Sequence, residues 1–189
     1  MKQRLASLAL LAVAASWGLT FVTMKDALNR QSVNSFLFYR FAIAALVLLI
    51  IHPQIIRKLN WDVIKHGGIP GLFLGAGFIV QTYGLHMTTA AVTGFITGLY
   101  VVATPLFEQI FGGKKLGLMV WISIAIATSG LALLSIHGAR IGFGEFLVLL
   151  CALFYTGQII GLSKWSAGRD VWTMTFVQIL VVAIMTGIA

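Results

Sequence analysis

Seven long apolar segments constrain this chain more than any other feature. They cover about 5–28, 36–51, 69–87, 91–111, 116–136, 143–162 and 171–189. A helix of roughly 20 mostly apolar residues crosses the hydrocarbon core of a bilayer. Hydrophobic residues make up 59% of the chain and charged residues only 10%, which excludes a soluble globular enzyme. We therefore predict an all-α integral membrane protein, a multi-helix bundle with about seven transmembrane helices.

The basic residues indicate how these helices are oriented. Cytoplasmic loops of membrane proteins carry an excess of Lys and Arg. With the N-terminus in the cytoplasm, nine basic residues fall on that side: Lys2, Arg4, Arg57, Lys58, Lys65, Lys114, Lys115, Lys164 and Arg169. Only Lys25, Arg30 and Arg140 fall on or near the opposite side. We predict a cytoplasmic N-terminus, a bacterial inner membrane as the location, and no nucleic-acid partner, because the net charge of +8 reflects membrane topology.

The N-terminus also resembles a signal peptide, with a basic start and Ala12-Val13-Ala14 placed like a cleavage site. However, the apolar run continues past Trp17 as far as Leu28. We therefore favour an uncleaved first helix.

The chain matches itself when it is shifted by 138 residues. The first span then falls on the sixth and the second on the seventh, without a gap; Trp17 meets Tyr155, and Arg40 meets Gln178. Five spans separate equivalent positions, so the second copy is inverted in the membrane, as in many secondary transporters. We predict inverted-topology five-helix repeats, with residues 1–138 as the first and 139–189 as the start of the second. Three further helices, about 90–110 residues in all, are expected to complete the second repeat.

The same segments resemble a known family. The matching positions are Trp17-Gly18 with Phe21 and Lys25, Arg40-Phe41, Pro105, Gly130, Gly144-Glu145 and Ala152-Leu153-Phe154-Tyr155. In order and spacing they are similar to the ten-helix, EamA-type members of the drug/metabolite transporter superfamily. The resemblance implies a substrate path through the centre of the bundle and export of amino acids, metabolites or drugs. One departure is Gly113-Lys114-Lys115, where the family usually places a Glu.

The fourth span carries a polar stripe along one helical face, formed by Thr93, Thr97, Tyr100, Thr104 and Glu108. Lipid cannot satisfy such a face, so it either lines a cavity or makes hydrogen bonds between helices. Glu108 is a candidate for proton coupling; alternatively, it pairs with one of the lysines that follow the helix. Proline in the same span removes a backbone hydrogen bond near Val101 and predicts a kink.

Arg40 is the most costly residue to place in a membrane. It either forms an ion pair with Asp26 or binds an anionic substrate. The other residues predicted to line the substrate path are aromatic or polar and lie in mid-span: Trp17, Thr20, Phe78, Gln81, Tyr83, Tyr155 and Gln158. Such a mixture of aromatic and polar groups is typical of ligand pockets.

The leading prediction is a secondary transporter that exports small organic solutes by alternating access. The alternative is a membrane scaffold or assembly protein without transport activity. No nucleophile, metal-ligand or nucleotide-binding pattern is present in the sequence, so we predict no enzyme activity, no metal and no cofactor. The expected partners are the lipid bilayer and a small-molecule substrate, with either a homo-oligomer or the missing C-terminal helices completing the bundle.

Overall fold

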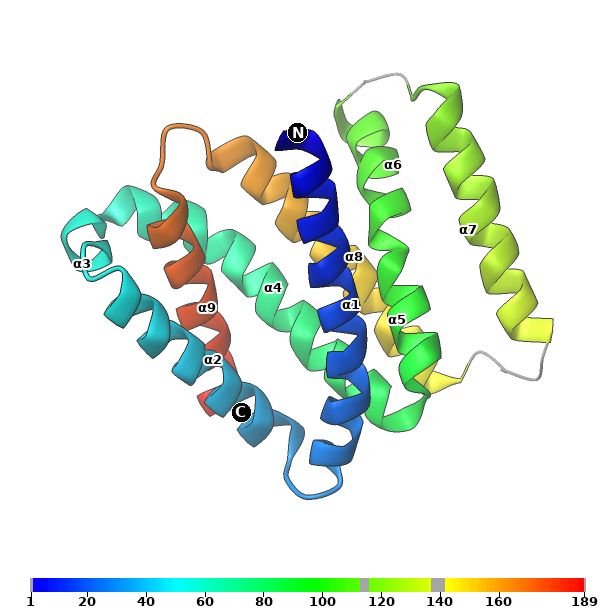
Figure 1. Cartoon of the computed structure of the whole chain (residues 1–189), viewed down its shortest axis with the longest axis horizontal. Helices are drawn as coiled ribbons and strands as arrows, with labels where there is room; N and C mark the ends of the chain where they lie inside the picture. Colours follow the sequence, from blue (N-terminus) through cyan, green and yellow to red (C-terminus); the bar gives the residue numbers. More distant parts are fainter. Residues whose placement is uncertain (1, 113–115, 137–141, 189) are drawn as a thin grey trace.

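The structure is a computed structural model that describes residues 2–112, 116–136 and 142–188. All regular secondary structure in these residues is helical (Figure 1). The helices are α1 (Lys2–Leu28), α2 (Val33–Ile51), α3 (Ile55–Lys58), α4 (Trp61–Met87), α5 (Ala90–Gly98), α6 (Tyr100–Gly112), α7 (Leu118–Ile136), α8 (Phe143–Trp165) and α9 (Val171–Ile188).

The predicted all-α membrane bundle is confirmed. Among the described residues, five helical segments are long and apolar enough to cross a membrane: Val33–Ile51, Trp61–Met87, Ala90–Ile110, Phe143–Trp165 and Val171–Ile188. Leu118–Gly130 is a shorter apolar helical segment. The first predicted span corresponds to α1, a single helix of 27 residues. The chain is therefore an integral membrane protein.

Side chains at the loop residues fix where several helices begin. The hydroxyl oxygen of Ser32 accepts a hydrogen bond from the N–H of Ser35 at 3.2 Å and so caps α2. Asn60 caps α4 through the N–H of Val63 at 2.9 Å. Such capping satisfies backbone donors that the first turn of a helix leaves unpaired.

The central helix of the bundle is α4, which packs mainly against α8 and α9. Its glycines allow this close approach, because small residues let helix backbones come together. Gly67, Gly71 and Gly75 face α9, while Gly77 and Gly84 face α8. Helix α2 packs on the other side of α9, and α7 lies at the edge of the bundle beside α6 (Figure 1).

The fourth predicted span is not continuous, because it divides into α5 and α6 at Leu99. The N–H of Leu99 donates to the carbonyls of Ile96 and Thr97 instead of the carbonyl four residues back. A kink was expected near Val101 from Pro105, and the break lies two residues before that position. Poor helix formers on both sides, Gly98 and Pro105, weaken the helix here.

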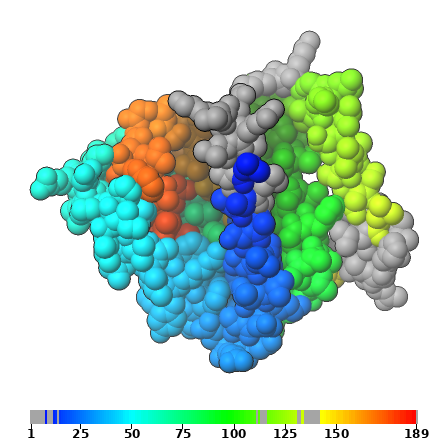
Figure 2. Space-filling model, viewed as in Figure 1, coloured from blue at the N-terminus to red at the C-terminus, as the bar shows by residue number. Residues whose placement is uncertain are grey.

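Successive long helices run in alternate directions, so the links gather at two ends of the bundle (Figure 1). The start of α1, α3 and the α8–α9 link lie at one end, and the α1–α2 and α4–α5 links lie at the other. Figure 2 shows α1 lying across the front of the bundle, with α2 on one side and α6 on the other.

Candidate functional site

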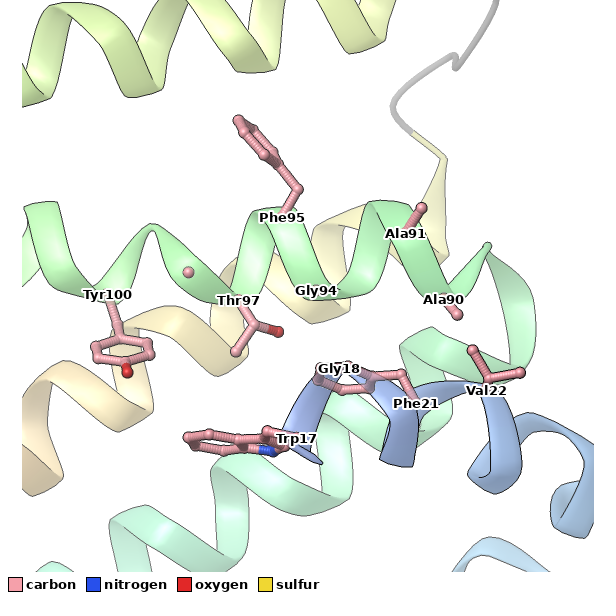
Figure 3. A pocket seen from close by; sticks show the side chains of 11 residues that line it. Trp17, Gly18, Phe21, Val22, Ala90, Ala91, Gly94, Phe95, Thr97 and Tyr100 are labelled. Carbon is pink, nitrogen blue, oxygen red and sulfur yellow. The ribbon is translucent and has the colours of Figure 1, made fainter. Parts of the chain in front are cut away.

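A cavity of about 540 Å³ opens between α1, α5 and the start of α6 (Figure 3). Its wall is mostly apolar and aromatic, and its lining residues are Trp17, Gly18, Phe21, Val22, Ala90, Ala91, Gly94, Phe95, Thr97, Gly98 and Tyr100. Small-molecule pockets commonly have this size and a few well-placed polar groups. Here the polar groups come from Thr97 and Tyr100, on either side of the break at Leu99.

A buried hydrogen-bond chain stands behind the cavity wall and joins three helices. Gln81 of α4 donates from Nε2 to the hydroxyl of Thr97 at 2.9 Å. The phenol of Tyr155, on α8, donates to Oε1 of Gln81 at 3.0 Å. All three side chains are buried. Buried polar groups that are mutually satisfied hold one another in fixed positions, so this chain fixes the hydroxyl that Thr97 presents to the cavity.

Aromatic rings extend this chain across the bundle. The ring of Tyr155 makes edge-to-face contacts with Tyr100 at 6.2 Å and with Phe78 at 5.6 Å between centroids. Phe78 in turn contacts Phe41 of α2 at 4.7 Å. Such pairs favour edge-to-face geometry and resist rotation of the rings. The structure thus brings five of the predicted path residues together: Phe78, Gln81, Thr97, Tyr100 and Tyr155.

Arg40 lies at the far end of this aromatic row. Its guanidinium carbon is 5.5 Å from the ring centre of Phe78 and 5.6 Å from that of Phe41. One guanidinium nitrogen approaches the sulfur of Met24 at 3.5 Å. The ion pair with Asp26, one of the two sequence-based expectations, is not formed; Asp26 is exposed at the end of α1.

Four other predicted path residues lie on α1, α4 and α6. Trp17 lines the cavity and Thr20, one turn along α1, bonds back to the Ser16 carbonyl at 2.9 Å. Thr104 likewise donates to the carbonyl of Tyr100 at 2.7 Å. Tyr83 is 39% exposed and does not line the cavity. The hydroxyls of Thr20 and Thr104 thus donate to carbonyl groups of their own helices.

Two predicted residues lie further from the cavity wall. Gln158 of α8 donates to Oε1 of Gln178 on α9 at 2.9 Å, so it joins these two helices. Glu108 is half-buried toward the end of α6. The structure places neither side chain among the lining residues of the cavity.

Sequence reasoning did not select the small and apolar part of the cavity wall. Phe21, Gly94, Phe95 and Gly98 all line the cavity, but residues of these types are common on any membrane helix. Gly94 and Gly98 are four residues apart, a spacing that commonly accompanies close helix packing. Instead, a methyl group added at Gly98 would meet no atom within 4 Å, because this glycine borders open space.

A cluster of charges closes the opposite end of the bundle, where α3, α4 and the α8–α9 link meet. Arg169 donates to both carboxylate oxygens of Asp62, at 2.6 and 2.9 Å, and to the carbonyl of Trp165 at 2.6 Å. Lys58 pairs with Asp170 at 2.5 Å. The hydrogen bond to Asp62 raises the pKa of Arg169. Hydrogen bonds from Lys58 and from the hydroxyl and backbone N–H of Thr173 lower the pKa of Asp170 to about 2.

The arrangement has the size and lining that suit a binding site for a small solute. In the described part of the chain, His, Cys, Asp and Glu side chains nowhere gather in a group of three that could hold a metal ion. The cavity itself offers aromatic surface, hydroxyl groups and a helix break in one wall. These are features suited to binding and release.

Comparison with known proteins agrees with these features. Residues 4–136 match the EamA-like transporter family. An uncharacterized transporter of Archaeoglobus fulgidus is 32% identical over 191 residues, which cover 98% of this chain and 58% of the relative. The chain thus spans little more than half the length of that protein. No solved structure is significantly similar to the chain. With 133 of its 189 residues matched, as 136 − 4 + 1 = 133, the chain belongs to the EamA-like transporter family.

Proposed function

We propose that the chain forms part of a secondary transporter that exports small organic solutes by alternating access. The observation that carries this proposal is the cavity between α1 and the broken α5–α6 pair. Its volume of about 540 Å³ suits a small organic molecule. The hydroxyls of Thr97 and Tyr100 supply the polar contacts that orient a ligand, and the broken helix supplies a point of movement.

Thiol labelling tests whether the cavity is a path for water-soluble molecules. Gly98→Cys places a thiol on the cavity wall, where added atoms meet open space. Val101→Cys is the matched control, because Val101 lies three residues further on, is 62% exposed and is not a lining residue of the cavity. The native Cys151 is fully buried and sets the background. A charged, membrane-impermeant methanethiosulfonate should modify Gly98→Cys at least about tenfold faster, since lipid excludes ions.

The alternative of a scaffold without transport predicts a different labelling result. A scaffold needs no aqueous path, so both cysteines would be equally protected, and export assays would be negative. Equal protection in lipid bilayers would therefore contradict the transporter proposal and favour the scaffold.

Loss of a cavity side chain should abolish export. Tyr100→Ala removes a ring and a hydroxyl from the cavity wall and breaks the contact with Tyr155. Tyr39→Ala, on a 59% exposed tyrosine of α2, is the matched control. The measurement is efflux of radiolabelled amino acids, organic acids and dyes from loaded cells, with equal expression of both variants. Unchanged export by Tyr100→Ala would remove Tyr100 from the path.

The inverted-repeat organisation is part of the same proposal. The helices that the 138-residue shift relates are similar in length: α2 has 19 residues and α9 has 18. The family match ends at residue 136, two residues before the predicted boundary between the repeats. The α1–α2 and α8–α9 links lie at opposite ends of the bundle (Figure 1). These observations support residues 1–138 and 139–189 as parts of two inverted copies.

The proposed orientation places the N-terminus in the cytoplasm of a cell whose inner membrane holds the protein. Asn29→Cys in the α1–α2 link should then react with an impermeant reagent added outside intact cells. Ala167→Cys in the α8–α9 link should react only after the cells are opened. Both positions are exposed. The reverse pattern would invert the proposed topology, and labelling of both from one side would contradict the inverted repeat.

A further inference from the structure

Arg40 is a cation in a membrane-spanning helix, and the described part of the chain gives it no anionic partner. Within the described residues, no carboxylate lies within 4.0 Å of its guanidinium. Its five N–H donors have one polar contact, to the sulfur of Met24 at 3.5 Å, and sulfur is a weak acceptor. A cation held at membrane depth is costly unless it is paired. The structure therefore leaves most of the hydrogen-bonding capacity of Arg40 unused.

The aromatic rings around Arg40 do not replace an anion. Phe41 and Phe78 lie 5.6 and 5.5 Å from the guanidinium carbon. Rings at this distance attract the positive charge but accept few conventional hydrogen bonds. They hold the group in place and leave its N–H donors available.

Glu145, Asp62 and Asp170 have other partners and do not pair with Arg40. Glu145 accepts hydrogen bonds from the hydroxyl of Thr88 and from the backbone N–H of Gly142. Asp62 and Asp170 pair with basic residues at the opposite end of the bundle. Lys25, on the same side as Arg40, donates to the backbone carbonyl of Thr88. Asp26, which follows Lys25 at the end of α1, is exposed and forms no ion pair with Arg40.

Arg40 does not line the cavity, but buried side chains connect it to the cavity wall. Met24, which contacts Arg40, follows the cavity residue Phe21 by three positions on α1 and lies on the same helical face. Phe21, Met24, Phe41, Phe78 and Tyr155 form one buried cluster, with Trp17 and Tyr100 packed against it. A ligand whose charged end reaches Arg40 would leave its apolar part against these aromatic residues.

We infer that the transported solute is an organic carboxylate, bound by Arg40 through its carboxylate and by the aromatic cluster through its apolar part. The inference rests on the transport function proposed above and assigns the chemical class of its solute. Arginine suits this task because its planar guanidinium binds a carboxylate through two parallel hydrogen bonds. A low-dielectric setting strengthens that attraction. A membrane phosphate offers similar oxyanion chemistry, so the experiment separates the two sources.

Binding of matched probes tests the inference. The probes are benzoate and its neutral analogue benzamide, which have the same ring and nearly the same shape. Equilibrium dialysis of the purified full chain in uncharged detergent should show at least about tenfold tighter binding of benzoate, which corresponds to about 1.4 kcal/mol. Arg40→Gln should lose that preference and keep its affinity for benzamide, which also shows that the variant is folded. Arg40→Lys should retain part of the preference, because it keeps the charge without the planar donor pair.

The control variant is Arg30→Gln, which removes an exposed cation from the neighbouring α1–α2 link. It should leave the preference for benzoate unchanged. An equal loss in Arg30→Gln would mean that general electrostatic attraction, and not a site, selects the anion. Wild-type protein that binds benzamide as tightly as benzoate would overturn the inference and leave the proposed transport function standing. Failure to bind either probe would count against both.

A repeat in lipid nanodiscs identifies the source of the oxyanion. Binding of benzoate should be the same in discs of phosphatidylcholine and in discs that contain phosphatidylglycerol. If phosphatidylglycerol abolishes it, a lipid headgroup occupies Arg40 and the assignment of a soluble carboxylate is wrong.

Discussion

The contact between α4 and α8 at Gly84 allows a quantitative test of the packing. A methyl group at Gly84 would lie 2.6 Å from a methyl carbon of Val148 and 2.8 Å from the carbonyl oxygen of Gly144. Carbon atoms ordinarily approach to about 3.5–4.0 Å. The side chain of Val148 can rotate, but the carbonyl is backbone, so α8 itself must move. We therefore expect Gly84→Ala to separate the two helices.

The matched control lies on the same helix. A methyl group at Gly68 would meet no atom within 4 Å. Both substitutions gain the same helix propensity, about 1 kcal/mol, and this gain cancels when the variants are compared. Overpacking of a tight core costs about 1–3 kcal/mol, and the fixed carbonyl places Gly84→Ala at the upper end. Gly84→Ala should therefore be about 2–3 kcal/mol less stable than Gly68→Ala.

Unfolding in mixed micelles measures this difference. Each variant is titrated with sodium dodecyl sulfate, and the tryptophan fluorescence reports the transition. Gly68→Ala should match or exceed the stability of the wild type. Equal stability of Gly84→Ala and Gly68→Ala would refute the conclusion that α4 and α8 pack at their limiting distance.

Two further changes probe the interior and the charged end. Gln81→Leu should lower the free energy of unfolding by about 1–3 kcal/mol, because it leaves the buried hydroxyls of Thr97 and Tyr155 without their partner. The same micelle titration measures this loss. An unchanged midpoint would show that the buried hydrogen-bond chain does not stabilise the fold. The pKa of Asp170, lowered to about 2 beside Lys58, lies below its unfolded value of about 3.9. Its contribution to stability is therefore full above pH 4 and lost as the pH falls toward 2. Asp170→Asn should flatten the pH dependence of the unfolding midpoint in this range; an unaltered profile would contradict the pairing.

The helices could be predicted from the sequence because a membrane span is recognisable by its length and its apolar composition. The sequence contains no comparable signal for which side chains of different helices pair with each other. Gln158 was expected on the substrate path, yet it bonds to Gln178, twenty residues away on the next helix. Arg40 was expected either to pair with Asp26 or to bind an anion, and only the three-dimensional arrangement showed that the pair is absent. Local spacing defines the face of a helix but not which neighbouring helix covers that face.

For the predicted path residues, too, spacing along one helix identified a shared face but not what covers that face. Thr97 and Tyr100 were found from their spacing on one helical face, and the structure places both on the cavity wall. Tyr83 was selected as an aromatic residue in mid-span, but it follows Gln81 by two positions, which places the two side chains about 200° apart around the helix. Tyr83 accordingly lies at the surface. Phe21 and Gly94 escaped notice because an apolar residue facing a cavity and one facing lipid look the same in a sequence.

The break at Leu99 divides the span into two helical segments of unequal length, α5 and α6, that can rotate about this point. With 9 and 13 residues, they measure about 14 and about 20 Å. A rotation of about 10° at Leu99 would move the far end of α5 by about 2 Å and that of α6 by about 3.5 Å. Helix α7 packs beside α6, the longer of the two segments, and would move with it. A small change in contacts at Thr97 and Tyr100 would thus be amplified toward the membrane surface at which α6 ends.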